Sequence, residues 1–349
     1  MVARRSPCRR PRATARSGRP ASLRGCDRHA RRRPGSERGP FRPVAVPTPA
    51  DRAFRTLATA AGAVSLIIVV TTFVFLVKES RPAFAATGTW HFFTNSIWNP
   101  AAGRFGVLGL LEGTIIIGAI AMCLAVPMAV GMALFINEFA PPRVRSVLTS
   151  TMDLLAALPS LLYGLWAYYA LQGRLQPIAQ FLTDHLSVLP FFRLSTPDAT
   201  LARSSFVAGV VVGFMILPII TSVSRDVMAQ VPREQCEGAL ALGGTRWGMI
   251  REVILPFGRS GIVGAALLGF GRALGETIAV ALVVSLVFQA NTHVLELGAG
   301  SIAALIATRF GEADSIERSG LVGAGLALFL LTFAVNLGAR RIVQSSRFG

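Results

Sequence analysis

Long uncharged apolar runs constrain the fold of this chain more than any other feature. A helix of about 20 residues crosses the roughly 30 Å hydrocarbon core of a bilayer. Five runs of that length contain no Asp, Glu, Lys or Arg, and a sixth contains only Arg272 and Glu276. Soluble helical proteins rarely contain so many such runs, so we predict an all-α membrane protein with a polytopic bundle of six transmembrane helices. The predicted spans are Thr56–Val77, Gly113–Asn137, Leu154–Gly173, Ser204–Ser224, Ser260–Ala290 and Ser319–Ala339.

The net charge of +17 suggests nucleic acid at first sight, but its placement argues against that partner. Sixteen of the arginines fall within residues 1–55, in a segment rich in Pro, Gly and Ser and without apolar periodicity. We therefore predict that residues 1–50 are a disordered tail. RNA binding by this tail and a gene start assigned too early remain alternatives. Residues 51–106 are predicted to hold the first transmembrane helix and an outer segment, and residues 107–345 the main transmembrane domain.

The distribution of basic residues predicts the orientation in the membrane. With the N-terminus inside, 26 Lys and Arg lie in the inside segments and 8 in the outside segments. The positive-inside rule then predicts that both termini lie in the cytoplasm. The membrane that we expect to hold the chain is the inner (cell) membrane. The connecting segments are too short for an independent soluble domain.

We expect no catalytic site, cofactor or metal site in this chain. The only lysine, Lys78, lies beside the first span and outside any glycine-rich phosphate-binding turn,. ATP hydrolysis would therefore need a separate chain. The four histidines are scattered outside the spans, which argues against a metal site at membrane depth.

The inside segment 225–259 predicts two short helices joined by a sharp turn. Pro232 can begin the first helix, Gly243-Gly244 can end it with a residue at positive φ, and Thr245 can cap the second. Pro256 is expected to break that second helix before the membrane. A bent helical pair tethered at the membrane suits docking into a groove on a soluble partner.

This segment resembles the EAA loop of bacterial ATP-binding-cassette import permeases. It departs from the motif at Gly238, where Ala is expected, and at Val253, where Ile is expected. The resemblance implies the type I importer permease fold, coupling to an ATPase subunit, a second homologous permease and an external binding protein. The residues that it assigns to ATPase coupling are Glu237, Gly238, Ala239, Gly243, Leu255 and Pro256.

Two further stretches are similar to phosphate-specific permeases, and to their C-type subunit in particular. They are Arg272–Thr277, which reads RALGET, and Asp153–Trp166, which reads DLLAALPSLLYGLW. Together they imply a phosphate path through the membrane domain, and the residues assigned to it are Arg272, Glu276 and Thr277.

The two charges within the sixth run agree with such a path. Each costs about 2.5–3.5 kcal/mol at a membrane helix centre, and such residues usually serve a function. Arg272 and Glu276 are four residues apart, which predicts that they share one helix face. A guanidinium can bond two oxygens of a phosphate, and a carboxylate can accept its P–O–H donor. A structural ion pair between the two charges is the alternative.

The sequence leaves several alternative functions to compare. The chain could carry another oxyanion or be the A-type phosphate subunit. It could be a stand-alone channel or secondary transporter, but such proteins have no use for an ATPase docking loop. A membrane-embedded enzyme would need convergent catalytic groups at membrane depth, where only Arg272 and Glu276 are found.

Overall fold

The computed structural model describes residues 49–186, 190–192, 201, 203–289 and 293–345. Almost all of the predicted disordered tail therefore lies outside the described residues. The chain divides into two units, residues 1–60 and 61–349, and the boundary falls within the first helix.

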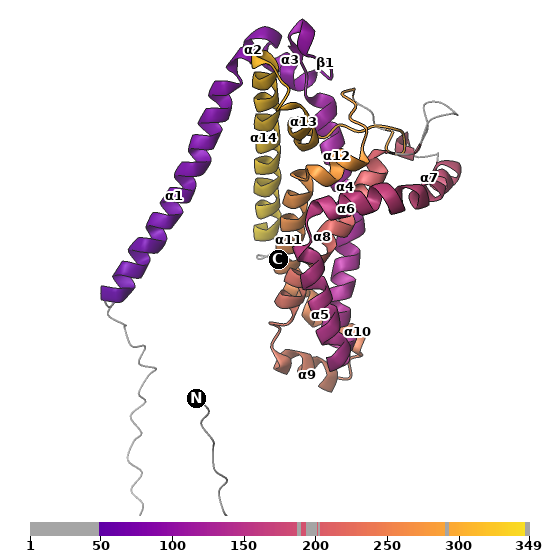
Figure 1. The fold of residues 1–349 in the computed structure, drawn as a ribbon. Coiled ribbons are helices and arrows are strands. Elements are labelled where there is room, and N and C mark those ends of the chain that lie inside the picture. The colour runs from indigo at the N-terminus through magenta and orange to yellow at the C-terminus, as the bar shows by residue number, and fades with distance from the viewer. Residues whose placement is uncertain (1–48, 187–189, 193–200, 202, 290–292, 346–349) are drawn as a thin grey trace, which may run out of the picture. The chain divides into compact units, whose positions relative to one another are not determined.

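The described residues are almost entirely helical (Figure 1). The outer hairpin pairs Trp98 with Phe105 and Asn99 with Arg104 in antiparallel register. The first half of the chain contains α1 (Pro49–Glu79), α2 (Arg81–Thr87), α3 (Thr89–Thr94), β1 (Trp98–Asn99), η1 (Pro100–Ala102), β2 (Arg104–Phe105), α4 (Leu108–Leu134), η2 (Phe135–Phe139), α5 (Pro142–Ala157), α6 (Ser160–Trp166), η3 (Ala167–Leu171) and α7 (Gln172–Leu186). The second half contains η4 (Pro190–Phe192), α8 (Ser205–Met228), α9 (Arg233–Ala241), α10 (Arg246–Met249), η5 (Ile250–Ile254), α11 (Leu255–Leu274), α12 (Ile278–Val283), α13 (Ile302–Arg309) and α14 (Ser315–Ser345).

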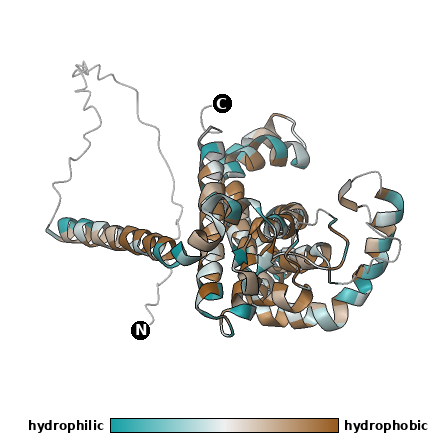
Figure 2. Ribbon diagram, turned by 90° about the horizontal axis from the view of Figure 1, so that it is seen from above, coloured by the Kyte–Doolittle hydropathy of each residue, from teal (hydrophilic) through white to brown (hydrophobic). Residues whose placement is uncertain are grey.

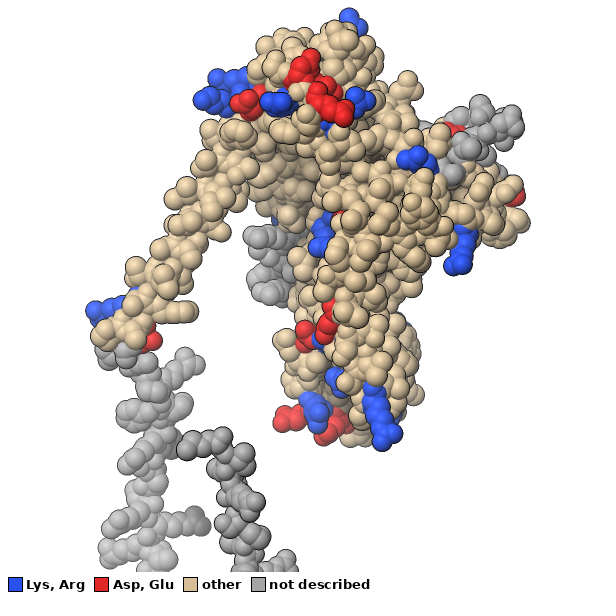
Figure 3. Space-filling view, in the orientation of Figure 1, with Lys and Arg blue, Asp and Glu red and all other residues tan. Residues whose placement is uncertain are grey.

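The helices agree with a membrane-spanning bundle. Within the described residues, five helical segments are long and apolar enough to cross a membrane, and a bent pair supplies a sixth. The helices are coloured mainly brown and white along their lengths in Figure 2. In Figure 3 the charged side chains of residues 61–349 gather mostly toward the two ends of the bundle. This distribution confirms the prediction of an all-α membrane fold.

The core of the bundle forms around α8, which is the most buried of the spans. Its small and branched residues, such as Ala208, Val212 and Ile216, pack with Ile117 and Ala121 of α4. By contrast, α1 contains no buried residue, and its large apolar side chains are exposed along the helix. Lipid can cover such a surface because hydrocarbon is as apolar as the side chains themselves.

The third predicted span is bent rather than continuous. α5 ends at Ala157, α6 begins at Ser160, and the two segments meet at 95°. Pro159 has no backbone N–H and forces Leu158 into an extended conformation, with φ −64° and ψ 136°,. The proline therefore produces a large bend where we predicted one span over Leu154–Gly173.

Candidate functional site

The apolar run that carries Arg272 and Glu276 is interrupted. α11 ends at Leu274 and α12 begins at Ile278, so Gly275, Glu276 and Thr277 form a break between two helices. The predicted single span Ser260–Ala290, with Arg272 and Glu276 on one helix face, is therefore wrong. Gly275 weakens a helix by about 1 kcal/mol. The Thr277 hydroxyl also donates to the Gly275 carbonyl at 3.0 Å, which gives the backbone a non-helical partner,.

Glu276 lies in this break and is buried, with 7% of its surface exposed. Its Oε1 accepts a hydrogen bond from the backbone N–H of Ala279 at 3.2 Å. That N–H belongs to the first turn of α12, where helical N–H groups have no intrahelical partner. The carboxylate therefore stabilises the start of α12, a role that the sequence did not suggest for it.

Arg272 lies in the last turn of α11, and its side chain is exposed. Within the described residues it forms no ion pair or hydrogen bond, so the pair with Glu276 that we weighed as an alternative is not formed. The guanidinium therefore keeps its donors free beside a break in the span.

The two irregular spans pack against each other at their breaks. α6, which follows the bend at Pro159, lies beside α12, which follows the break at Glu276 (Figure 1). The contact is close because residue 164 is glycine: a Cβ there would lie 2.9 Å from the Cα of Ala279. Discontinuous membrane helices of this kind form binding sites in many transporters.

The segment 225–259 forms the predicted bent helical pair. α9 begins directly after Pro232, and Gly243 adopts φ +86° at its end. The Thr245 side chain caps α10 by accepting from the backbone N–H of Gly248 at 3.1 Å. These three helix signals in the sequence are confirmed.

Gly244, which we named with Gly243 as the end of the first helix, is a second required glycine, through a close contact that we did not predict. A Cβ on residue 244 would lie 2.6 Å from the backbone oxygen of Ala239. The Gly244 N–H donates to that same oxygen at 3.1 Å. The turn therefore closes by a contact that only glycine allows. A Gly-Gly pair in a turn is the signal that could have indicated it.

α9 has one face toward the bundle and one toward solvent. Cys236 and Ala239 pack, together with Leu255, against a buried cluster that includes Met228 and Ile250. Glu237 and Gly238 are exposed, and a Cβ at Gly238 would meet no atom within 4 Å. Large apolar side chains are exposed on α9 and on the turn and helix that follow it, and these are Leu240, Leu242 and Trp247.

Pro256 does not end a helix, in contrast to our prediction. The segment from Arg246 to Leu274 continues through the membrane-facing turn. The wider π turn η5 lies directly before the proline. A π turn changes the hydrogen-bond pattern by one residue, so it accommodates a residue without an N–H. α10, η5 and α11 are therefore one continuous element, and it ends at Leu274, two residues after Arg272.

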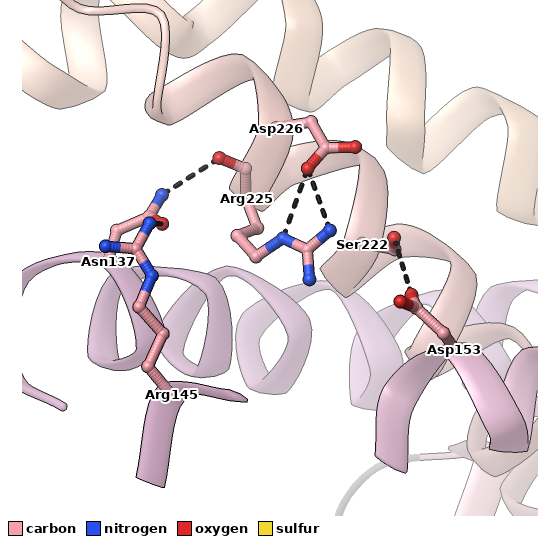
Figure 4. A network of polar contacts seen from close by, with 6 residues as sticks. All are labelled: Asn137, Arg145, Asp153, Ser222, Arg225 and Asp226. Atoms are coloured by element: carbon pink, nitrogen blue, oxygen red, sulfur yellow. Dashed lines mark hydrogen bonds and ion pairs between the residues drawn. The ribbon is translucent and has the colours of Figure 1, made fainter. Parts of the chain in front are cut away.

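A polar network ties α5 to the end of α8 and to η2 (Figure 4). The Asn137 amide donates to the Arg225 carbonyl at 2.9 Å and accepts from the Arg145 guanidinium at 3.1 Å. Arg225 forms a 2.8 Å ion pair with the neighbouring Asp226.

A second contact joins the same two helices closer to the bend. The Ser222 hydroxyl donates to the Asp153 carboxylate at 3.2 Å. Together with the network around Asn137, it clamps α5 to α8. The clamp lies between the bent helical pair at 225–259 and the bend at Pro159.

Comparison with known proteins assigns a class to this arrangement. The family model for the inner membrane component of binding-protein-dependent transport systems matches residues 125–347. The chain belongs to this family. The matched region includes the clamp, both irregular spans and the whole bent helical pair.

The most informative relatives are named for phosphate transport. The chain is 40% identical to the phosphate transport system permease protein PstC 2 of Mycobacterium tuberculosis, over 84% of this chain and 91% of the relative. It is 39% identical to the phosphate transport system permease protein PstC of Xylella fastidiosa, over 83% and 90% of the two chains. These similarities confirm the resemblance to phosphate permeases.

A solved structure supports the fold. A bacterial alginate ABC transporter, in complex with an alginate pentasaccharide-bound periplasmic protein, aligns with a TM-score of 0.54. The alignment covers 84% of this chain and 97% of that chain at 16% sequence identity. The chain therefore has the fold of an ABC importer permease.

Proposed function

We propose that the chain is the permease subunit of an ATP-driven phosphate importer. It forms part of the translocation path and docks an ATPase subunit, but hydrolysis takes place in that separate chain. The phosphate permeases that are 39–40% identical to it support the substrate. The single structural observation that carries the proposal is the Arg272 guanidinium, which has no ion pair among the described residues and lies beside a break in a membrane span.

Arg272 is proposed to hold the phosphate oxyanion. A planar guanidinium can bond two oxygens of one anion at once, and such charge-assisted hydrogen bonds are about twice as strong as neutral ones. A charged residue at membrane depth is costly unless it has a function or a partner. A phosphate that arrives at the break supplies the partner that Arg272 lacks.

Glu276 and Thr277 are proposed to line the same part of the path. Phosphate near neutral pH carries a P–O–H donor and sulfate carries none, so the Glu276 carboxylate would accept from phosphate and repel sulfate. The same carboxylate stabilises the first turn of α12. A Gln at this position keeps an oxygen for the Ala279 N–H but loses the charge.

Competition between the two anions tests this role. Vesicles with the assembled importer and Glu276→Gln should take up phosphate with more inhibition by sulfate than wild type shows. The external binding protein is supplied already loaded, so its own selectivity does not dominate the result. Unchanged discrimination in this assay would remove Glu276 from the selectivity filter.

The bent helical pair is proposed to dock the ATPase subunit. Its outer face combines the Glu237 carboxylate with the apolar side chains of Leu242 and Trp247, whose exposed fractions are 91% and 63%. Large exposed apolar and aromatic residues are typical of the centre of an interface. Because Arg246–Leu274 is one continuous helix, movement of this pair reaches Arg272 directly.

The remaining partners follow from the same proposal. A second permease subunit completes the path, and an external binding protein delivers phosphate to the outer loops. Both termini face the cytoplasm of a cell whose inner membrane holds the chain, as the distribution of basic residues favours. Residues 225–259 then lie on the side where ATP is available.

Purification of the tagged chain in detergent tests the assembly. An ATPase subunit and a second six-span permease should accompany it. Vesicles that contain the complex should import phosphate only when ATP and the binding protein are both present. A chain that purifies alone and transports without ATP would contradict the proposal.

A further inference from the structure

The side chain of Tyr163 stabilises the bend at Pro159 with a hydrogen bond. In a regular helix the Leu155 carbonyl would accept from the N–H of residue 159, but that residue is proline and has no N–H. The Tyr163 hydroxyl instead donates to the Leu155 oxygen at 2.9 Å, across the bend. The N–H of Leu158 also donates to the same oxygen, in a longer hydrogen bond of 3.3 Å. Tyr163 therefore supplies the short hydrogen bond that the proline removed.

The helix that carries Tyr163 packs beside the proposed phosphate site. The neighbouring residue, Gly164, lies against α12 three residues after Glu276, because a Cβ on residue 164 would lie 2.9 Å from the Ala279 Cα. Tyr163 itself packs against a buried cluster that includes Ala273, the residue after Arg272, and Val280 of α12. Tyr163 therefore takes part both in the bend of one span and in the packing around the break of the other.

A phenol hydroxyl has one proton and donates one hydrogen bond at a time. In this structure that donor is used by a neutral carbonyl. An oxyanion held by Arg272 would be a stronger acceptor, because a hydrogen bond to a charged group is about twice as strong as one to a neutral group. The two acceptors therefore compete for one proton.

We propose that Tyr163 is an anion-binding residue of the path that also controls the bend between α5 and α6. When phosphate binds at Arg272, the hydroxyl leaves the Leu155 carbonyl and donates to the anion. The bend then keeps only the longer Leu158 hydrogen bond to this carbonyl, and α5 moves more easily against α6. This inference rests on the proposed function. It links substrate binding to α5, the helix that the Asp153–Ser222 hydrogen bond holds against α8.

The surroundings of the bend leave room for this movement. An open apolar groove of about 390 Å³ is lined by Leu155, Leu158 and Tyr163 together with Phe214 and Leu217 of α8. Side chains at the bend therefore border open space on one side and can change position without displacing a close-packed core.

The test uses Tyr163→Phe in the full complex, reconstituted in vesicles with the ATPase subunit, the second permease and loaded binding protein. Tyr168→Phe is the matched control, since Tyr168 follows on the same helical segment, is 45% exposed and forms no hydrogen bond within the described residues. Phosphate uptake and ATP hydrolysis are measured together. Loss of a hydrogen bond to an anion predicts a fall of about tenfold in phosphate imported per ATP for Tyr163→Phe. Tyr168→Phe should match wild type.

A second measurement reports binding without transport. Inorganic phosphate at high concentration should raise the thermal unfolding temperature of the wild-type complex, and this rise should shrink in Tyr163→Phe. A wild-type ratio of phosphate to ATP in Tyr163→Phe would overturn the inference, as would an equal fall of uptake and hydrolysis. If Arg272→Ala is inactive and Tyr163→Phe is normal, only this inference fails. A fully active Arg272→Ala would instead refute the proposed function.

Discussion

Substitution of Gly244 by Ala should uncouple the bent helical pair from its ATPase. The added Cβ would lie 2.6 Å from the Ala239 backbone oxygen, well inside an ordinary contact distance. Backbone cannot rotate away as a flexible side chain can, so the turn between α9 and α10 must open. The Gly244 N–H would also lose its 3.1 Å bond to that oxygen.

The magnitude follows from these two losses. Forced overpacking costs about 1–3 kcal/mol, and a lost backbone hydrogen bond adds about 0.5–1.5 kcal/mol. A total near 2–4 kcal/mol corresponds to a docking-competent turn that is populated about 30-fold to 1,000-fold less. In purified complexes we expect Gly244→Ala to lose most of the ATPase subunit and most ATP-dependent uptake.

Gly238→Ala is the matched control for this experiment. It adds the same methyl group to the same loop, but nothing lies within 4 Å of the new Cβ. Alanine should favour α9 by about 1 kcal/mol relative to glycine, so docking should be unchanged or slightly stronger. Equal ATPase retention by both variants would refute the argument that the turn geometry sets docking.

Three further predictions address the surface, a thiol and the clamp. Leu242 is 91% exposed in this chain, and an apolar contact with the ATPase would bury it, so Leu242→Asp would bury a charge there and should abolish co-purification of the ATPase,. An intact complex would show that Leu242 lies outside the interface. Burial raises the pKa of the Cys236 thiol, so at neutral pH less thiolate is present than for a free cysteine,. In a variant whose other cysteines are serine, the maleimide labelling rate of Cys236 should therefore rise with pH at a higher midpoint than the rate of a free thiol. A midpoint equal to that of a free thiol would contradict this. A double-mutant cycle with Asp153→Ala and Ser222→Ala, read by thermal unfolding, should give a coupling energy of about 0.5–1.5 kcal/mol,; zero coupling would show that the contact does not clamp α5.

The positions of the spans could be predicted from hydropathy, but the irregularities within them could not. The charge of Glu276 marks the break at Gly275–Thr277, but a charge alone does not show that the backbone leaves the helix, since Gly and Thr are tolerated within membrane helices. The charge was read as part of a helix face, whereas in the structure the Glu276 carboxylate accepts from the Ala279 N–H at the start of a new helix. A proline such as Pro159 disrupts a helix, but its presence alone did not predict a bend of 95° within the span Leu154–Gly173,.

The bent helical pair was readable because its signals are local. Pro232, Gly243 and Thr245 act through their own φ angle or through hydrogen bonds within three residues. The prediction that Pro256 breaks the helix was wrong, because its effect depends on the turn that precedes it. A proline ordinarily ends a helix, but the π turn η5 before Pro256 changes the backbone hydrogen-bond pattern,. No residue type in the sequence predicts a π turn. The clamp between Asp153 and Ser222 joins residues 69 apart in the chain and could not be found from spacing alone.

The central claim is that phosphate crosses the membrane in contact with Arg272. Its most direct test is phosphate uptake by vesicles that contain the complete importer with Arg272→Ala, beside Arg174→Ala as a control at an exposed arginine of α7. Loss of a charge-assisted contact of about 1.5–3 kcal/mol predicts at least a tenfold fall in uptake for Arg272→Ala and none for Arg174→Ala. Uptake at the wild-type rate by a fully assembled Arg272→Ala importer would contradict the account.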